Sequence, residues 1–231
     1  MGNFPSHIVQ IETADGSKSL YNTELDETYH SRHGALQEAI HVFIQNGLLP
    51  MVGQKKTVRI LEMGLGTGLN AILTWIEAEK QGVNVEYCAL ESFVLPTEMI
   101  VESNFFSEEW KSKTAKLFSA EWGTVQRLDS TFSVQKINGL VEEIELSAQE
   151  PFDVIYFDAF GPRVQPHLWT VPIFEKFYNA LAPGGLFVTY CAKGQVRRDL
   201  QSVGFAMERL PGPPGKREML RGAKTRMAND Q

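Results

Sequence analysis

The feature that most constrains the fold is an alternation, from Thr57 onward, of short apolar runs with segments of helical periodicity. The apolar runs are rich in β-branched residues and predict strands at 58–63, 85–91, 132–137, 152–160 and 186–191. The segments between them predict helices near 69–80, 96–105, 166–181 and 193–202. Strands that alternate with helices are typical of an α/β fold, in which a mostly parallel, doubly wound sheet carries helices on both faces.

Both ends of the chain depart from this alternation. Residues 204–210 and 216–222 flank a PGPPG turn, which predicts an antiparallel C-terminal hairpin on the otherwise parallel sheet. Alternating apolar and polar residues around Asp15-Gly16 predict a second hairpin, and apolar residues at helical spacing from Gly34 predict a helix that stops at Gly47. The 231 residues suffice for one large core, so we expect an N-terminal extension (1–50) packed on a main domain (51–231), functionally one domain.

Composition argues against several classes of protein. The chain has 22 basic and 28 acidic residues and a net charge of -6. This charge argues against a protein that binds nucleic acid or membrane over its entire surface. Its two cysteines, Cys88 and Cys191, lie in apolar runs and predict buried reduced thiols. The sequence shows no signal-peptide pattern and no apolar run near the roughly 18 residues of a membrane span, so we expect a cytoplasmic protein without membrane contact.

A glycine-rich segment, ILEMGLGTGLN (60–70), ends a predicted strand and begins a helix. Its glycines at positions 64, 66 and 68 allow a sharp turn and the approach of a ligand to the main chain. The pattern E-x-G-x-G-x-G differs from the G-x-G-x-x-G of dinucleotide-binding proteins and lacks a P-loop lysine, which disfavours a pyrophosphate ligand. The alternative is that the glycines only form a tight turn.

Three acidic residues stand at the ends of predicted strands. Glu62, two residues before the first glycine, suits a ligand with an ammonium or sulfonium group. Glu91 ends the next strand, where a carboxylate can accept both hydroxyls of a ribose, although it is alternatively a solvated strand end. Asp158 ends the strand at 152–160. Together with the glycines, these carboxylates suggest S-adenosylmethionine as the cofactor.

Several longer segments carry a family resemblance, namely YHSRHGALQEAIHVFIQNGL (29–48), EMGLGTGLN (62–70), FDAFGPRVQPHLWT (157–170), GGLFVTYCAKGQVRRDLQSVGF (184–205) and PGPPGKREMLRG (211–222). In these segments and their order, the chain resembles the MnmD-type methyltransferases, the unit that also forms the N-terminal half of the bifunctional MnmC proteins. The resemblance implies a Rossmann-like, S-adenosylmethionine-dependent methyltransferase. Its implied reaction is methylation of the primary amine of 5-aminomethyl(-2-thio)uridine at the wobble position of tRNA. The flavin-dependent half of the fused proteins has no counterpart in this sequence, so no flavin is expected.

Asp158 is the predicted catalytic residue, because a carboxylate at a strand end can orient the amine and accept its proton. The predicted cofactor contacts are Glu62, Gly64, Gly66, Thr67, Gly68, Asn70, Glu91, Ser92 and Asp158. The matched YHS segment implies a lid that contains Tyr29 and Ser31. One departure concerns adenine recognition, because the sequence reads Asn138-Gly139-Leu140 where the family commonly has Gly-Asp. The acidic contact is then missing unless Asn138 or Glu142 replaces it.

The predicted substrate contacts combine aromatic and basic residues. Phe160 is expected to form a wall beside the methyl donor, and Trp169 to stack on the target base or, alternatively, to lie in the core. Between Lys193 and Arg226 nine basic residues face three acidic ones, which predicts a basic C-terminal face for tRNA or, alternatively, a solvated surface. Its predicted contacts are Lys193, Arg197, Lys216 and Arg217.

The histidines at positions 30, 33 and 167 have no metal-ligand spacing and are assigned to helix surfaces, so no metal is expected. Three other functions remain open. The chain is alternatively a methyltransferase of a small amine or a protein, or an oxidoreductase that uses a nicotinamide cofactor or acts on CH–NH groups as in the fused relatives. The third alternative is an RNA-binding subunit with a vestigial nucleoside pocket.

Overall fold

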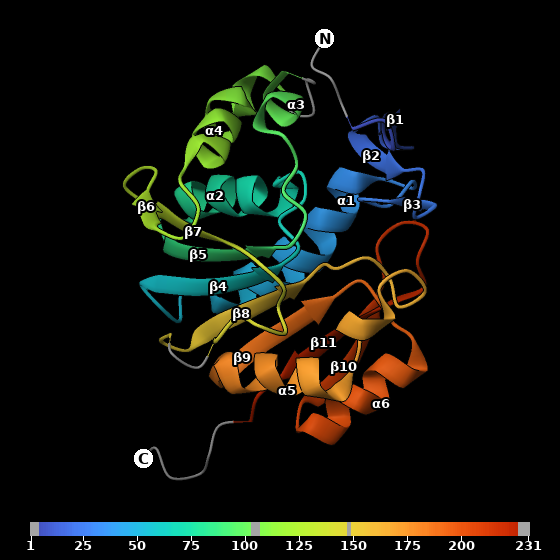
Figure 1. Ribbon diagram of the computed structural model, residues 1–231. Helices are drawn as coiled ribbons and strands as arrows, with labels where there is room; N and C mark the ends of the chain where they lie inside the picture. The colour runs from blue at the N-terminus through green and yellow to red at the C-terminus, as the bar shows by residue number, and fades with distance from the viewer. Residues whose placement is uncertain (1–4, 103–106, 147–148, 226–231) are drawn as a thin grey trace.

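The computed structural model describes residues 5–102, 107–146 and 149–225. Its main sheet consists of β4 (Thr57–Met63), β5 (Asn84–Glu91), β6 (Val125–Arg127), β7 (Phe132–Asn138), β8 (Phe152–Phe157), β9 (Leu181–Thr189), β10 (Ala206–Pro211) and β11 (Glu218–Ala223). Their order across the sheet is β10-β11-β9-β8-β4-β5-β7-β6 (Figure 1). The five strands from β9 to β7 are parallel, whereas the pairs β6–β7, β9–β11 and β10–β11 are antiparallel. The predicted mostly parallel sheet with an antiparallel C-terminal hairpin is therefore confirmed.

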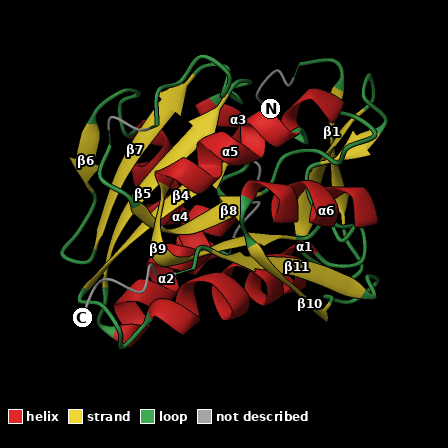
Figure 2. Cartoon of the chain, turned by 90° about the horizontal axis from the view of Figure 1, so that it is seen from below, coloured by secondary structure: helices red, strands yellow, loops and turns green. Residues whose placement is uncertain are grey.

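Helices cover both faces of this sheet, whose edge strands β6 and β10 lie far apart in the turned view of Figure 2. One face carries α1 (Ala35–Ala39), the π-helix η1 (Ile40–Leu48), α2 (Leu69–Gln81), α3 (Thr97–Glu102) and α4 (Glu108–Ser119). The other face carries α5 (Val171–Ala180) and α6 (Gly194–Val203). Successive side chains of β8 alternate between the two cores, with Val154 and Tyr156 in the first and Ile155 and Phe157 in the second. This alternation makes β8 buried on both faces.

The N-terminal extension forms a small antiparallel sheet of β1 (Ile8–Glu12), β2 (Lys18–Asn22) and β3 (Glu27–Thr28), beside α1 in Figure 1. The hairpin predicted around Asp15-Gly16 is the β1–β2 pair. Ile8 and Leu20 of this hairpin belong to the same buried cluster as the residues of η1 and α2. The extension therefore shares a hydrophobic core with the main sheet.

The prediction that Gly47 stops a helix was wrong, because this glycine lies inside η1 and the short 3-10 helix η2 (Leu49–Met51) follows directly. A Cβ atom at Gly47 would lie 2.8 Å from Cε1 of Tyr156. The glycine thus allows the helix to approach the sheet closely. The helix predicted at 166–181 is divided into the 3-10 helix η3 (Pro166–Leu168) and α5.

Other boundaries also differ from the prediction. β8 ends at Phe157, not at residue 160, and β9 begins at Leu181, five residues before the predicted strand. The elements β3, α4 and β6 were not predicted. Cys88 and Cys191 are buried free thiols, as expected. Within the described ranges, no helix has the length and apolar character needed to cross a membrane.

Candidate functional site

The candidate site lies at the carboxyl ends of β4, β5 and β8. Met63 at the end of β4 is the register partner of Leu90 in β5 and of Phe157 in β8, so the three strands end at one edge of the sheet. From β4 the chain continues to β5 and β7 on one side, and it returns to β8 and β9 on the other. Open α/β sheets bind ligands at such a switch point.

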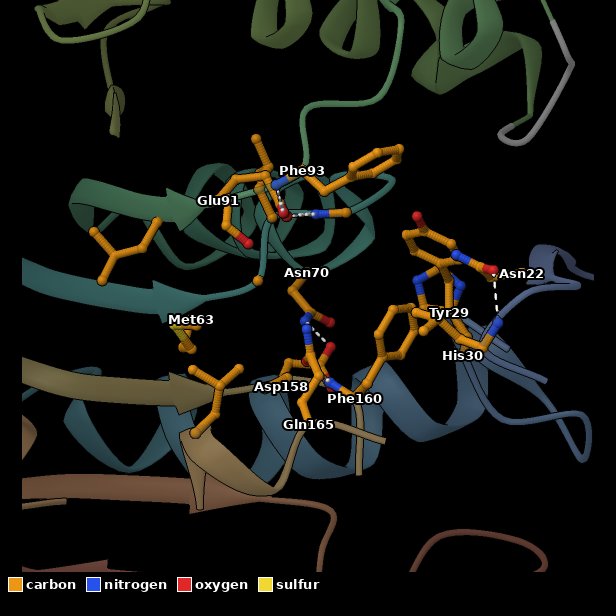
Figure 3. Close-up of a pocket in the computed structure, with 18 of the residues that line it drawn as sticks. Asn22, Tyr29, His30, Met63, Asn70, Glu91, Phe93, Asp158, Phe160 and Gln165 are labelled. Atoms are coloured by element: carbon orange, nitrogen blue, oxygen red, sulfur yellow. Dashed lines mark hydrogen bonds between the residues drawn. The ribbon is translucent and has the colours of Figure 1, made fainter. Parts of the chain in front are cut away.

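A cavity of about 330 Å³, called here the first cavity, opens at this edge (Figure 3). Its walls include Gly64, Gly66 and Asn70 from the glycine turn and α2, Glu91 and Ser92 from the end of β5, and Asp158 and Phe160 from the loop after β8. The N-terminal extension closes the opposite side with His7, Asn22, Glu24, Leu25, Tyr29 and His30. The predicted contacts Glu62, Thr67 and Gly68 are not part of this wall.

Two glycines of the turn have conformations and surroundings that exclude a side chain. Gly64 has a φ angle of 91°, and a Cβ atom there would lie 2.9 Å from the carbonyl oxygen of Asp158. Gly66 has a φ angle of 50°, and its Cβ atom would lie 3.3 Å from Cδ1 of Tyr29. The turn, called here the cradle, lines the first cavity with bare backbone at these two positions, and a side chain at either would meet neighbouring protein atoms.

Glu91 is held by the backbone on both carboxylate oxygens. Oε2 accepts a hydrogen bond from the amide of Gly66 at 2.9 Å, and Oε1 accepts one from the amide of Phe93 at 2.8 Å. Burial raises the pKa of this carboxyl. Since a carboxylate has about four acceptor sites, each oxygen keeps capacity for a ligand hydroxyl. This geometry suits the predicted recognition of a ribose.

Asn70 links two acidic residues beneath and beside the cavity. Its Nδ2 donates to Oε1 of Glu62 at 2.9 Å and to Oδ2 of Asp158 at 2.8 Å. Burial raises the pKa of Glu62 well above its usual value and that of Asp158 to about 7. Burial therefore favours the protonated form of Glu62, and Asp158 is poised to exchange a proton near pH 7. Among the described residues, Oε2 of Glu62 and Oδ1 of Asn70 are buried without a hydrogen-bond partner.

The N-terminal extension contributes residues whose role the sequence analysis missed. His30 is half-buried, with Nδ1 2.9 Å from the Ser19 hydroxyl and Nε2 3.1 Å from that of Thr67. Burial lowers the pKa of His30 to about 4, so the ring is neutral at pH 7. The assignment of His30 to a helix surface was wrong, because the residue fastens β2 to the glycine turn. Thr67 accordingly faces His30 and not the cavity.

Tyr29, from the predicted lid, packs its ring edge-on to Phe160 with ring centroids 5.1 Å apart. Tyr29 and Phe160 stand on the same side of the first cavity in Figure 3. Beyond them lies a second cavity of about 370 Å³. The two cavities share the wall formed by Tyr29, His30, Asp158, Ala159 and Phe160. The second cavity is further lined by Ser31, Glu38, Tyr190, Lys193 and Lys216.

Trp169 is not placed to stack on a base, and that prediction was wrong. The side chain is buried, its Nε1 donates to the carbonyl oxygen of Phe160 at 2.8 Å, and its ring packs edge-on to Phe157. The alternative of a core residue is the correct one. Trp169 thus supports the Phe160 wall from behind.

The predicted basic contacts separate into two groups. Lys216 points to Glu38 in the wall of the second cavity, with Nζ 2.5 Å from Oε2, so it is not a free surface cation. Lys193 lines the same cavity and is exposed, Arg217 is exposed, and Arg197 is half-buried on α6. Other basic residues of this segment pair internally, as Arg209 does with Glu218 and Arg221 with Glu208, and Arg226 lies outside the described residues.

The segment 138–142, where an acidic contact to adenine was expected, does not reach the first cavity. Leu140 is exposed, and the amide of Gly139 donates to the carbonyl oxygen of Glu91 at 3.1 Å. Neither Asn138 nor Glu142 lines the first cavity. Among the described residues, Phe93 and His7 instead bring aromatic rings to the rim, with centroids 5.9 Å apart.

Comparisons with known proteins agree with this geometry. Residues 104–225 match a protein family described as S-adenosyl-L-methionine-dependent methyltransferase. The chain is similar to the tRNA 5-methylaminomethyl-2-thiouridine biosynthesis bifunctional protein MnmC of Pseudomonas fluorescens, with 31% identity over 212 residues, 85% of this chain and 32% of that protein. The protein of the same name from Cupriavidus necator is 28% identical over 222 residues, 86% of this chain and 32% of that protein. The chain thus spans 32% of the length of these curated relatives.

The fold is also similar to the crystal structure of MNMC2 from Aquifex aeolicus, with a TM-score of 0.81 and 23% identity. The match covers 98% of this chain and 73% of that one. The similarity therefore includes the N-terminal extension as well as the main sheet. At this level of identity, it supports the fold.

Proposed function

Because this chain belongs to the S-adenosyl-L-methionine-dependent methyltransferase family, we propose that it methylates the primary amine of 5-aminomethyl(-2-thio)uridine at the wobble position of tRNA. The product is the 5-methylaminomethyl nucleoside. The observation that carries this proposal is the wall shared by the two cavities. A cofactor in the first and an amine in the second would meet at Asp158. The names of the MnmC relatives, which refer to 5-methylaminomethyl-2-thiouridine biosynthesis in tRNA, support the choice of substrate.

The residues of the first cavity fit S-adenosylmethionine. The backbone cradle at Gly64 and Gly66 leaves room for the amino-acid part of the cofactor, and Glu91 offers acceptors for the ribose hydroxyls. Ser92 and Asn70 also line this cavity. When bound, the cofactor supplies an electrophilic methyl group on a sulfonium. The proposed reaction requires neither a metal ion nor a flavin in this chain.

Asp158 is the proposed proton acceptor. A primary amine is largely protonated near pH 7 and attacks only through a free lone pair, so the site must remove one proton. The carboxyl of Asp158, with a pKa of about 7, takes up that proton and is held in orientation by Nδ2 of Asn70. The packed rings of Tyr29 and Phe160 would limit the access of water to the junction of the two cavities. When the lone pair of the neutral amine bonds to the methyl carbon, the bond from that carbon to the sulfonium sulfur would break and leave its electron pair on sulfur. The products would be a neutral thioether and a protonated secondary amine.

The proposed tRNA contacts lie around the second cavity. Lys193, Arg197 and Arg217 combine positive charge with access to solvent on the β10–β11 side of the molecule. Contacts to phosphates weaken steeply as salt rises, so tRNA affinity should depend strongly on ionic strength. The N-terminal extension and the main domain act as one functional unit in this proposal, because both supply walls of both cavities. The substrate places the reaction in the cytoplasm.

The test is incubation of the protein with labelled S-adenosylmethionine and bulk tRNA from cells that lack it, followed by nucleoside mass analysis. We expect one added methyl group on 5-aminomethyl(-2-thio)uridine. The variant Asp158→Ala should bind the cofactor in calorimetry and lose nearly all methyl transfer. Methylation of a small amine or a protein, with tRNA untouched, would contradict the proposed substrate. Undiminished turnover by Asp158→Ala would remove that residue from the mechanism.

A further inference from the structure

We propose that Glu38 and Lys216, an ion pair in the far wall of the second cavity, are positioning residues that set the charge state of Asp158 in opposite senses. Glu38 belongs to α1 of the N-terminal extension, and Lys216 belongs to the turn between β10 and β11. Both residues and Asp158 line the same cavity. The role of this pair in catalysis rests on the proposed function. The electrostatic coupling of the pair to Asp158 does not depend on that function.

The ion pair is partly buried, with the Glu38 side chain 10% exposed and the Lys216 side chain 29% exposed. Glu38 is 8% exposed, and its Oε2 lies 2.5 Å from Nζ of Lys216, although the contact does not have hydrogen-bond geometry. In such surroundings charges interact more strongly than on an open surface, because solvent screens them less. A charge in this wall therefore acts on a carboxyl across the cavity.

Lys216 is held in place by more than its partner. Its Nζ lies 3.8 Å from the centroid of the Tyr190 ring, and the Tyr190 hydroxyl donates to the carbonyl oxygen of Ala159 at 2.9 Å. Gly215, with a φ angle of 83°, packs so closely that a Cβ atom there would lie 2.3 Å from the ring of His33. The turn is therefore docked on the extension, and Lys216 is connected through Tyr190 to the residue that follows Asp158.

The two members of the pair act on Asp158 with opposite signs. Burial is the largest cause that raises the pKa of Asp158 to about 7, and the negative charge of Glu38 raises it further. The hydrogen bond from Asn70 and the positive charge of Lys216 lower the same pKa. An opposite charge favours the ionised carboxyl and a like charge disfavours it. The opposite effects of Glu38 and Lys216 partly cancel, and together they hold the pKa of Asp158 near neutral pH, where the carboxyl can both lose and accept a proton.

Other groups face Asp158 from the elements around it. They are Glu62 on β4, Tyr87 on β5, Tyr190 after β9, and Tyr29 and His30 on the extension. Burial raises the pKa of each of these tyrosines and lowers that of His30, so all four rings are neutral at pH 7. Glu62 titrates together with Asp158. Of these groups, Tyr190 contacts Lys216 directly and also feels the charge of Glu38, but its ring stays neutral at pH 7 and adds no charge when the pair is changed.

The test is a titration of the Asp158 carboxyl carbon by nuclear magnetic resonance in protein labelled with carbon-13 aspartate, with the signal assigned by its loss in Asp158→Asn. We expect Glu38→Gln to move the midpoint down and Lys216→Met to move it up, each by about half a pH unit or more. The double variant should lie between them. Lys216→Arg keeps the charge and should restore a midpoint near that of the wild type.

The matched controls are Glu208→Gln and Arg221→Met, which break an ion pair of 2.8 Å in the same β10–β11 hairpin and should leave the Asp158 midpoint unchanged. Displacement of the midpoint in the same direction by both members of the Glu38–Lys216 pair would overturn the proposal. An unchanged midpoint in either variant would do so too.

The rate of methyl transfer against pH provides the second measurement. The pH at which the rate rises on the acidic side should be lower in Glu38→Gln and higher in Lys216→Met, parallel to the carboxyl titration. Opposite shifts in the titration without shifts in the rate would support the coupling and contradict the role of Asp158 as proton acceptor. A wild-type protein that does not methylate tRNA would contradict the proposed function and still leave the titration to decide the coupling.

Discussion

Replacement of Asp158 by asparagine should stabilise the protein, and the gain should grow with pH. The folded state raises the pKa of this carboxyl from 3.8 to about 7, mainly because the group is buried. Between those values the folded protein binds more protons than the unfolded chain, so the free energy of unfolding falls as pH rises through this window. Asparagine has no proton to lose and escapes that cost.

The magnitude follows from the size of the shift. At about 1.4 kcal/mol for each pKa unit, the raised pKa of Asp158 lowers the free energy of unfolding by about 4 kcal/mol at pH 8 and by about 1.5 kcal/mol at pH 5. At pH 5 the folded carboxyl keeps its proton while the unfolded one is ionised. The stabilisation by Asp158→Asn should therefore increase by about 2.5 kcal/mol between these two pH values. The charge of Asp158 also raises the pKa of Glu62, so its removal acts on Glu62 in the same direction. Contacts that asparagine makes or loses cancel in this difference.

Urea unfolding followed by tryptophan fluorescence, without cofactor, measures the free energy of unfolding of both proteins at pH 5 and pH 8. Met63→Leu is the matched control, because Met63 lines the same cavity and carries no titrating group. Its effect should be equal at both pH values. A difference between Asp158→Asn and wild type that stays constant, or that shrinks with rising pH, would refute the argument that burial raises this pKa.

Three further predictions concern the cradle, the RNA surface and the Phe160 wall. Gly66→Val should abolish cofactor binding in calorimetry, because the side chain would meet the Tyr29 ring from a backbone with a φ angle of 50°; wild-type affinity would contradict the placement of the cradle. Arg217→Glu should weaken tRNA binding in low salt and reduce its salt dependence while cofactor affinity is kept, and an unchanged salt dependence would place the RNA surface elsewhere. Trp169→Phe should lower the free energy of unfolding by about 1–2 kcal/mol through the lost hydrogen bond to Phe160, without weakening tRNA binding directly; a pure loss of RNA affinity would restore the stacking role.

Much of the fold follows from periodicity in the sequence. β4, β5, β7 and β8 read as short apolar runs between helical segments, and their predicted positions agree with the structure to within a few residues. The failures have physical causes. α4 has a polar composition, and the residues it buries, Thr114, Leu117 and Phe118, form only a narrow stripe at helical spacing among charged residues, which the sequence analysis overlooked. Gly47 was interpreted as a helix stop, yet the constraint on it is a tertiary contact with Tyr156.

The site likewise contains residues that the sequence brings together and contacts that it does not predict. Gly64, Gly66, Glu91 and Asp158 lie together because strand ends at one edge of a parallel sheet meet, and strand order alone predicts this. Contacts between segments distant in the chain were not predictable. The pairing of Glu38 with Lys216 joins residues 178 positions apart, and neither neighbourhood signals the other. Lys216 was consequently assigned to the RNA surface with the other basic residues of its segment.

The N-terminal extension decides what the sheet edge can bind. The edge itself supplies two carboxyl groups, and burial raises the pKa of Glu62 well above its usual value and that of Asp158 to about 7. His30 remains neutral because burial lowers its pKa to about 4, and its bonds to Ser19 and Thr67 fix the extension to the glycine turn. That attachment places Tyr29 over Gly66 and thereby separates a first cavity from a second. The extension thus supplies Tyr29 and His30 to the wall between the two cavities, and the loop after β8 supplies Asp158, Ala159 and Phe160.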